Sequence, residues 1–144
     1  MGVAIGPRAV GLMGDEIGLR AKRIPELGLV GEPLPCRPAA VEASLAAGLV
    51  PVVAPLAAGP LNVNADEMAA ALAAGLGAEQ IVFLTDVPGL LRDGAVVARI
   101  PADEAEDLLA SGELEGGILP KLTAAVTAAR LGVAASIGET AVHA

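Results

Sequence analysis

A strand, a helix and a second strand follow one another in the middle of the sequence, and this order constrains the fold more than any other feature. The first predicted strand is the apolar run Leu49–Leu56. The helix is indicated by an apolar residue at every fourth position, at Met68, Leu72 and Leu76. The second strand, Ile81–Leu84, is a short apolar run without alternation, as expected for a strand buried on both faces of a parallel sheet. Two strands joined through a helix predict a right-handed crossover and an α/β protein.

Polar side chains stand at the ends of these predicted elements. Asn62, Asn64 and Asp66 alternate along an extended segment, which puts all three side chains on one face. Thr85 and Asp86 directly follow the second strand. In α/β sheets the carboxyl ends of strands and the amino ends of helices face the ligand. We therefore expect both polar groups on one rim of the sheet.

The composition favours small-molecule chemistry. The chain has 144 residues, a formal net charge of −8 and 54 % hydrophobic residues, with Phe83 as its single aromatic side chain. This length suits one domain with a core of Val, Leu, Ile and Ala. An acidic chain offers no basic stripe for the phosphates of nucleic acid or of an anionic membrane. We expect a small-molecule substrate and neither a nucleic-acid nor a membrane partner.

Residues 43–65 carry no charge, but they do not predict a membrane span. They hold five residues that would break a spanning helix: Pro51, Pro55, Pro60, Asn62 and Asn64. The single Cys36 excludes an internal disulfide and fits a reducing compartment. With His143 it cannot build a metal cluster, so no metal ligands are predicted. We expect a soluble, cytoplasmic protein.

The remaining elements follow from turn residues and apolar runs. Upstream we expect strands at residues 8–12, 19–23 and 29–37, then a helix at Pro38–Ala47. Downstream we expect a strand at 96–100, a helix opened by Pro101, a long helix from 118 that ends at Gly132, and a strand at 133–137. The last residues, 139–144, show no evident partner. No repeat or linker divides the chain, so residues 1–144 are expected to form a single domain.

Three segments in this order resemble the amino acid kinase family. They are Asn62–Asp66 (NVNAD), Thr85–Gly89 (TDVPG) and Gly116–Lys121 (GGILPK). The resemblance implies an α/β fold with an open, mostly parallel sheet sandwiched between helices, here incomplete. It also implies that residues 1–144 correspond to the carboxyl-terminal, nucleotide-binding part of such a kinase plus a piece of the part that binds the amino acid.

The same resemblance implies roles for individual residues. Asn62 and Asn64 would bind the substrate, while Asp66 and Lys121 would be catalytic. An amide suits an acylated amino acid, because it donates to a carboxylate and accepts from an N–H. Lys121, one of two lysines in the chain, would meet the charge on the transferred phosphoryl group. The residues that would line the nucleotide are Thr85, Asp86, Val87, Pro88, Gly89, Leu90, Leu91, Glu113, Leu114, Glu115 and Gly117.

Each of these positions also has a purely structural interpretation. Asn64 followed by Glu67 three residues later is a helix-capping pattern. Asp66 in a first helical turn stabilises the helix dipole. Lys121 could be a solvated lysine beside an apolar stripe. From the residues alone, both interpretations stay open.

The resemblance implies ATP-dependent phosphorylation of the side-chain carboxylate of N-acetyl-L-glutamate in arginine biosynthesis. ATP with Mg²⁺ would be the co-substrate, with no tightly bound cofactor, and the full-length form would be a homo-oligomer. The family's opening strand and phosphate loop have no counterpart here, so we expect a truncated form that is nearly inactive alone. Two alternatives are a kinase for aminoadipate held on a carrier protein, in lysine biosynthesis, and a non-catalytic module that binds nucleotide or amino acid.

Overall fold

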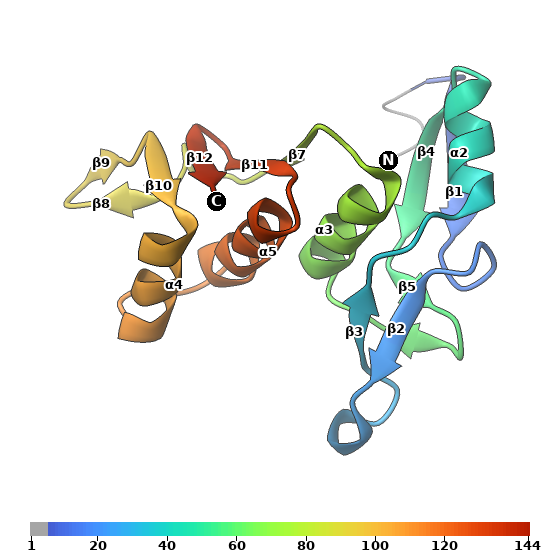
Figure 1. Ribbon diagram of the computed structural model, residues 1–144, viewed down its shortest axis with the longest axis horizontal. Helices are drawn as coiled ribbons and strands as arrows, with labels where there is room; N and C mark the ends of the chain where they lie inside the picture. Colours follow the sequence, from blue (N-terminus) through green and yellow to red (C-terminus); the bar gives the residue numbers. More distant parts are fainter. Residues whose placement is uncertain (1–5) are drawn as a thin grey trace. The chain divides into compact units, whose positions relative to one another are not determined.

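The computed structural model describes residues 6–144, which divide after Met68 into two compact units (Figure 1). The α/β class is confirmed, because helices and both parallel and antiparallel strand pairs occur along the chain. In the described residues, no helix is long and apolar enough to cross a bilayer.

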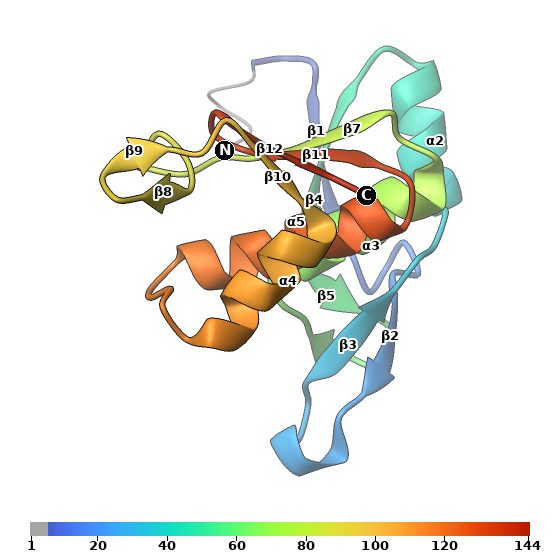
Figure 2. The same cartoon turned by 60° about the vertical axis from the view of Figure 1, so that its left-hand side comes forward.

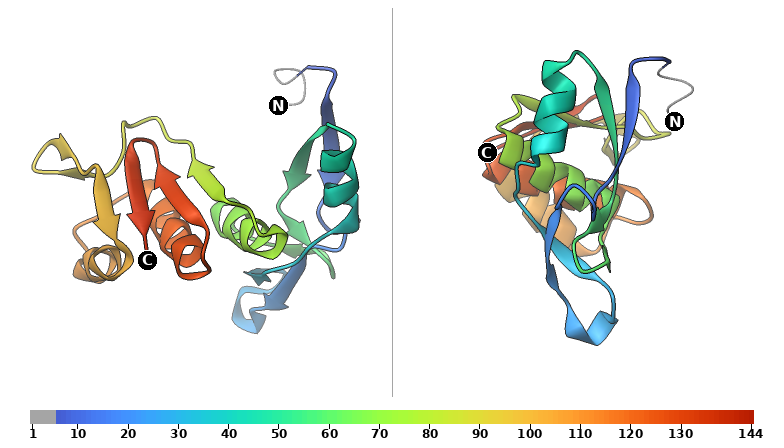
Figure 3. Two further views of the ribbon diagram at one scale, coloured as in Figure 1. Left: turned by 45° about the horizontal axis from the view of Figure 1, so that its top comes forward. Right: turned by 90° about the vertical axis from the view of Figure 1, so that its right-hand side faces the viewer.

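The first unit is built on a parallel pair of strands, β1 (Ala9–Met13) and β4 (Val50–Ala54). Helix α2 (Ala39–Ala46) packs against β4 and lies alongside the pair (Figure 3). An antiparallel hairpin, β2 (Arg20–Arg23) with β3 (Gly31–Leu34), carries a 3-10 turn at Pro25–Leu27 near its tip. The predicted strands and helix of this half are therefore confirmed, with β1 shifted by one residue and the other elements shorter than predicted.

A short antiparallel pair, β5 (Leu56–Ala57) with β6 (Leu61–Asn62), leads into helix α3 (Ala65–Leu76). The helix follows the predicted stripe and ends at Gly77, whose φ of +66° suits a residue without a side chain. α3 begins in the first unit and continues in the second.

The second unit is organised around a sheet in which four strands are described, in the order β10–β12–β11–β7. Their bounds are β7 Gln80–Phe83, β10 Arg99–Pro101, β11 Ala134–Ile137 and β12 Thr140–His143. The β10–β12 and β11–β7 pairs are parallel, whereas β11 and β12 form an antiparallel hairpin. A small hairpin, β8 (Leu91–Arg92) with β9 (Ala95–Val96), precedes β10.

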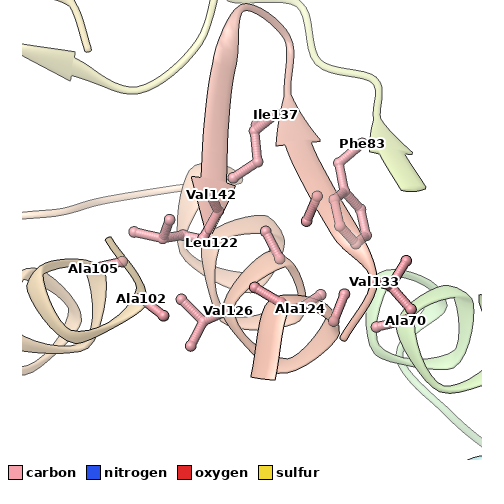
Figure 4. Close-up of a cluster of buried hydrophobic side chains, with 14 of the residues drawn as sticks. Ala70, Phe83, Ala102, Ala105, Leu122, Ala124, Val126, Val133, Ile137 and Val142 are labelled. Atoms are coloured by element: carbon pink, nitrogen blue, oxygen red, sulfur yellow. The ribbon is translucent and has the colours of Figure 1, made fainter. Parts of the chain in front are cut away.

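Helices α4 (Ala102–Ser111) and α5 (Ile118–Arg130) pack against one face of this sheet (Figure 2). Figure 4 shows the apolar contact, with Phe83, Ile137 and Val142 from the strands above Leu122 and Val126 of α5. The two helices approach closely because many of the buried residues in their packing are alanines.

Three predictions about strands are corrected by the structure. β4 and β7 do not belong to one sheet, because β4 pairs with β1 and β7 pairs with β11. β7 is not buried on both faces, since Val82 is 50 % exposed and the following Leu84 is 82 % exposed. Residues 139–144 do not lack a partner, because β12 lies between β10 and β11.

Candidate functional site

A pocket of about 340 Å³ opens in the second unit. Three segments form it: the loop that follows β7, the connection between α4 and α5, and the first turn of α5. The residues that line it are Thr85, Asp86, Val87, Gly89, Leu90, Leu91, Glu113, Leu114, Glu115, Gly117, Ile118 and Lys121. The segments lie far apart in sequence, and the sheet and α5 bring them together.

The pocket has an apolar wall and a polar rim. Leu90 is buried and Leu114 and Ile118 are half-buried, so they offer an apolar surface. Asp86, Glu113 and Glu115 are exposed carboxylates on the lining, and Lys121 is a half-buried cation. Such a lining can hold a flat apolar group and, next to it, a charged one.

The amino end of α5 contributes backbone donors. Gly117 is the N-cap residue, and no side chain caps this end of the helix. The first N–H groups of a helix have no carbonyl partner within it, and its dipole places partial positive charge there. Because Gly117, Ile118 and Lys121 all line the pocket, this helix end makes the pocket suitable for an anion.

The loop that follows β7 is fixed by the β11–β12 hairpin. The backbone N–H of Gly138 donates to the Phe83 carbonyl at 3.2 Å, and that of Glu139 donates to the Pro88 carbonyl at 2.8 Å. Further along the loop, the N–H of Leu90 donates to the side-chain hydroxyl of Thr140 at 2.8 Å. The shape of the pocket wall thus depends on residues about fifty positions later in the chain.

The amide cluster, Asn62 and Asn64, lies in the first unit. The two side chains are exposed while Val63 between them is buried, as the predicted alternation requires. The backbone N–H of Asn62 donates to the Leu29 carbonyl at 2.8 Å, which holds β6 beside the chain after the β2–β3 turn. Two amide side chains are therefore presented on one face of an anchored segment.

Asn64 caps helix α3. Its Oδ1 accepts hydrogen bonds from the backbone N–H groups of Asp66 and Glu67, at 2.9 and 3.2 Å. The capping interpretation is confirmed. It leaves the amide nitrogen of Asn64 as the group with which a ligand could interact. The prediction that Asp66 continues the extended segment is wrong, because α3 begins at Ala65. Asp66 is half-buried in the first turn of this helix, where a carboxylate suits the helix dipole.

The structure gathers most of the residues that the sequence assigned to a nucleotide. Of the predicted lining, only Pro88 is not part of the pocket, and its carbonyl instead holds the hairpin through Glu139. Sequence reasoning missed Ile118 as a pocket residue; it begins α5, packs against the core and also lines the pocket. It also missed Thr140, because nothing in the sequence indicates that this side chain reaches Leu90.

Comparison with known proteins gives a family match over most of the chain. The sequence model described as "Amino acid kinase family" matches residues 3–138. An acetylglutamate kinase of Roseiflexus castenholzii is 42 % identical over 142 residues, which cover 93 % of this chain and 55 % of the relative. An acetylglutamate kinase of Rubrobacter xylanophilus is 47 % identical over 139 residues, covering 94 % of this chain and 55 % of the relative. The chain thus spans about half the length of the curated relatives it matches.

A solved structure supports the same fold. A crystal structure of a protein from Streptococcus mutans UA159 matches with a TM-score of 0.85 at 24 % sequence identity. The match covers 98 % of this chain and 63 % of that protein. At this identity the likeness concerns the fold alone.

Proposed function

This chain belongs to the amino acid kinase family, and from that premise we propose that it is part of an ATP-dependent N-acetyl-L-glutamate kinase of arginine biosynthesis. The proposed reaction transfers the γ-phosphoryl group of Mg·ATP to the side-chain carboxylate of N-acetylglutamate. The observation that carries the proposal is the pocket, because it gathers residues Thr85–Leu91, residues 113–115 and Lys121 around an apolar wall.

The pocket suits a nucleotide on chemical grounds. The apolar wall of Leu90, Leu114 and Ile118 would pack against the base. The exposed carboxylates of the rim would accept hydrogen bonds from ribose hydroxyls or from the exocyclic amine of adenine. The phosphates would lie toward the amino end of α5, where backbone N–H groups and Lys121 favour negative charge.

Lys121 is proposed as a catalytic cation. Phosphoryl transfer involves little covalent chemistry for the protein, so catalysis depends on positioning and on positive charge near the transferred group. Lys121 lies in the first turn of α5, where its side chain lines the pocket. There its charge would add to that of the helix end and of Mg²⁺ carried by the nucleotide.

The amide cluster is proposed to hold the acylated amino acid. Asn62 is exposed on an anchored strand, so its amide can donate to a carboxylate and accept from the acetamido N–H. Asn64 would contribute its amide nitrogen while its Oδ1 caps α3. Asp66 is proposed as a catalytic carboxylate in the first turn of α3.

The division into two units fits this assignment of roles. We assign Ala69–Ala144 to the nucleotide-binding part of the kinase and Met1–Met68 to a piece of the part that binds the amino acid. A cytoplasmic location and a homo-oligomeric full-length form belong to the same proposal.

The carrier-linked aminoadipate kinase remains the competing member of the family. An aspartate at position 64 would cap α3 as well as asparagine does, so capping alone does not select between the two kinases. The choice of N-acetylglutamate rests on the family resemblance, because kinases for carrier-linked aminoadipate tend to have an acid and a glycine where this chain has Asn64 and Ala65.

The proposal is tested by calorimetric titration of the purified chain with Mg·ADP. We expect binding that weakens at least tenfold in Asp86→Ala and in Lys121→Met, since hydrogen bonds to charged groups contribute about 1.5–3 kcal/mol. The matched control is Lys22→Met, which removes the other lysine from β2 of the first unit. A folded chain that binds no Mg·ADP would refute the nucleotide assignment and favour a module without this function.

A further inference from the structure

Thr140 is a buried polar residue that takes no direct part in the pocket. Its side chain is fully buried in β12, and its Oγ1 accepts the backbone N–H of Leu90 at 2.8 Å. Leu90 is 1 % exposed and lines the pocket. A buried N–H without a partner is costly, so this hydroxyl satisfies a donor that water cannot reach.

The backbone of the loop approaches the hairpin closely around this contact. A Cβ added to Gly89 would lie 2.6 Å from Thr140 Oγ1 and 3.2 Å from the Ile137 carbonyl oxygen. The neighbouring hairpin turn is equally close, because a Cβ added to Gly138 would lie 2.4 Å from the Pro88 carbonyl oxygen. The loop backbone therefore lies directly on the hairpin, and the Thr140 hydroxyl is one of the groups in contact with it.

We propose that Thr140 is a positioning residue for the pocket: its hydroxyl fixes the Leu90 backbone, and so sets how the loop that follows β7 presents its side chains to the ligand. The expected effect of Thr140 on nucleotide affinity rests on the proposed function. Its expected effect on the loop that follows β7 does not. Thr140 touches no ligand. It acts through the backbone N–H of Leu90, and the carbonyl of the same residue accepts the N–H of Val97 at 2.9 Å.

The test compares Thr140→Val with Thr140→Ser. Valine keeps the shape and removes the acceptor, whereas serine restores the hydroxyl. We expect Thr140→Val to weaken Mg·ADP binding roughly fivefold to tenfold, because the loop must be held in place at the moment of binding. Thr140→Ser should bind within about twofold of the wild type. The control is Thr127→Val, which removes a hydroxyl bonded to the Thr123 carbonyl within α5 and outside the pocket lining.

A second measurement needs no nucleotide. In amide exchange followed by NMR, the Leu90 N–H should exchange slowly in the wild type and in Thr140→Ser and at least tenfold faster in Thr140→Val. The amide signals of residues 85–87 and 89–91 should shift in the valine variant only. A wild-type chain that binds no Mg·ADP refutes the proposed function, while the exchange data still decide whether Thr140 holds the loop.

Three results would overturn the inference. One is a Leu90 N–H that exchanges as slowly in Thr140→Val as in the wild type. Another is a Thr140→Ser variant that restores neither Mg·ADP binding nor slow exchange of the Leu90 N–H. The third result applies if Thr140→Val does not fold. In that case, fast exchange of the Leu90 N–H in the wild type or in Thr140→Ser would refute the contact.

Discussion

Asn64 Oδ1 lies 2.9 Å from the backbone nitrogen of Asp66 and accepts its N–H. One amide side chain therefore starts helix α3 and stands in the segment proposed to bind substrate. The two roles use different atoms of the same group, and suitable substitutions separate them.

Substitutions of Asn64 should affect the stability of the chain and its affinity for substrate separately. We expect Asn64→Ala to lower the free energy of unfolding by about 1 kcal/mol through loss of the cap, and Asn64→Asp to leave it nearly unchanged. Both variants should lose affinity for N-acetylglutamate in a chain that binds it, because neither offers an amide donor. Denaturant unfolding and calorimetry measure the two effects. Equal unfolding energies for the alanine and aspartate variants would contradict the cap.

Glycine at position 138 should be required by contact as well as by conformation. Gly138 has a φ of +53° and Gly132 a φ of +84°, so alanine is strained at either site. Only at Gly138 does the added Cβ meet backbone, at 2.4 Å from the Pro88 carbonyl oxygen, whereas the space around Gly132 is open. We expect Gly138→Ala to be the more destabilising by about 1–3 kcal/mol. The matched pair is compared by thermal unfolding, and similar losses would show that the hairpin does not press on the loop.

The ion pairs between α4 and α5 should respond to salt. Arg130 of α5 bonds to Glu106 and Asp103 of α4, and these hydrogen bonds raise the pKa of Arg130 above its usual range. A base with a raised pKa keeps its stabilising effect throughout the neutral range and loses it only at strongly alkaline pH. Arg130→Met should therefore lower Tm slightly at low salt, and the difference should shrink in 1 M salt because these side chains are exposed.

The control for that measurement is Arg99→Met. Arg99 is an exposed arginine of β10 for which the described residues show no ion pair. Its substitution should leave both Tm and the salt dependence of Tm unchanged. A salt-independent loss in Arg130→Met would mean that its stem contributes through packing rather than charge.

The 144 residues alone should turn over slowly as a kinase. Among the described residues, Lys121 is the one cation that lines the pocket. Phosphoryl transfer depends on several cations and N–H groups around the transferred group, and one such cation can contribute a factor of about 10³–10⁵. The turnover rate is measured by trapping the acyl phosphate product as a hydroxamate and following its amount over time. Turnover near the ordinary kinase range, about 1 s⁻¹ or more, would contradict the expectation.

The sequence predicted the elements whose signals are local. Helix α3 was recognisable because Met68, Leu72 and Leu76 repeat at the helical period and Gly77 follows. The residues of the pocket could be predicted as a set through the family resemblance, and the structure places all but Pro88 around one space.

Strand partners and strand burial could not be predicted in the same way. The pairing of Ala9 with Val50 joins residues forty-one positions apart, and no local pattern encodes it. The run at Ile81–Leu84 is apolar throughout, so its composition gave no sign that Val82 would be half exposed. Threonine is usually an exposed residue, so nothing in the sequence indicated that Thr140 would be buried. In the structure its hydroxyl is covered where Gly89 approaches closely.

The position of β12 in the sheet has a consequence for the order of folding. Within the described chain, β10 pairs with β12 alone, and β12 is formed by residues 140–143. A ribosome releases residues 99–101 some forty residues before their partner strand. Until that strand arrives, β10 has no hydrogen-bonding neighbour in this sheet, and the loop that follows β7 lacks the hairpin that holds it. Nascent chains stopped before residue 140 should therefore remain sensitive to proteases in this half, and protection should appear in one late step.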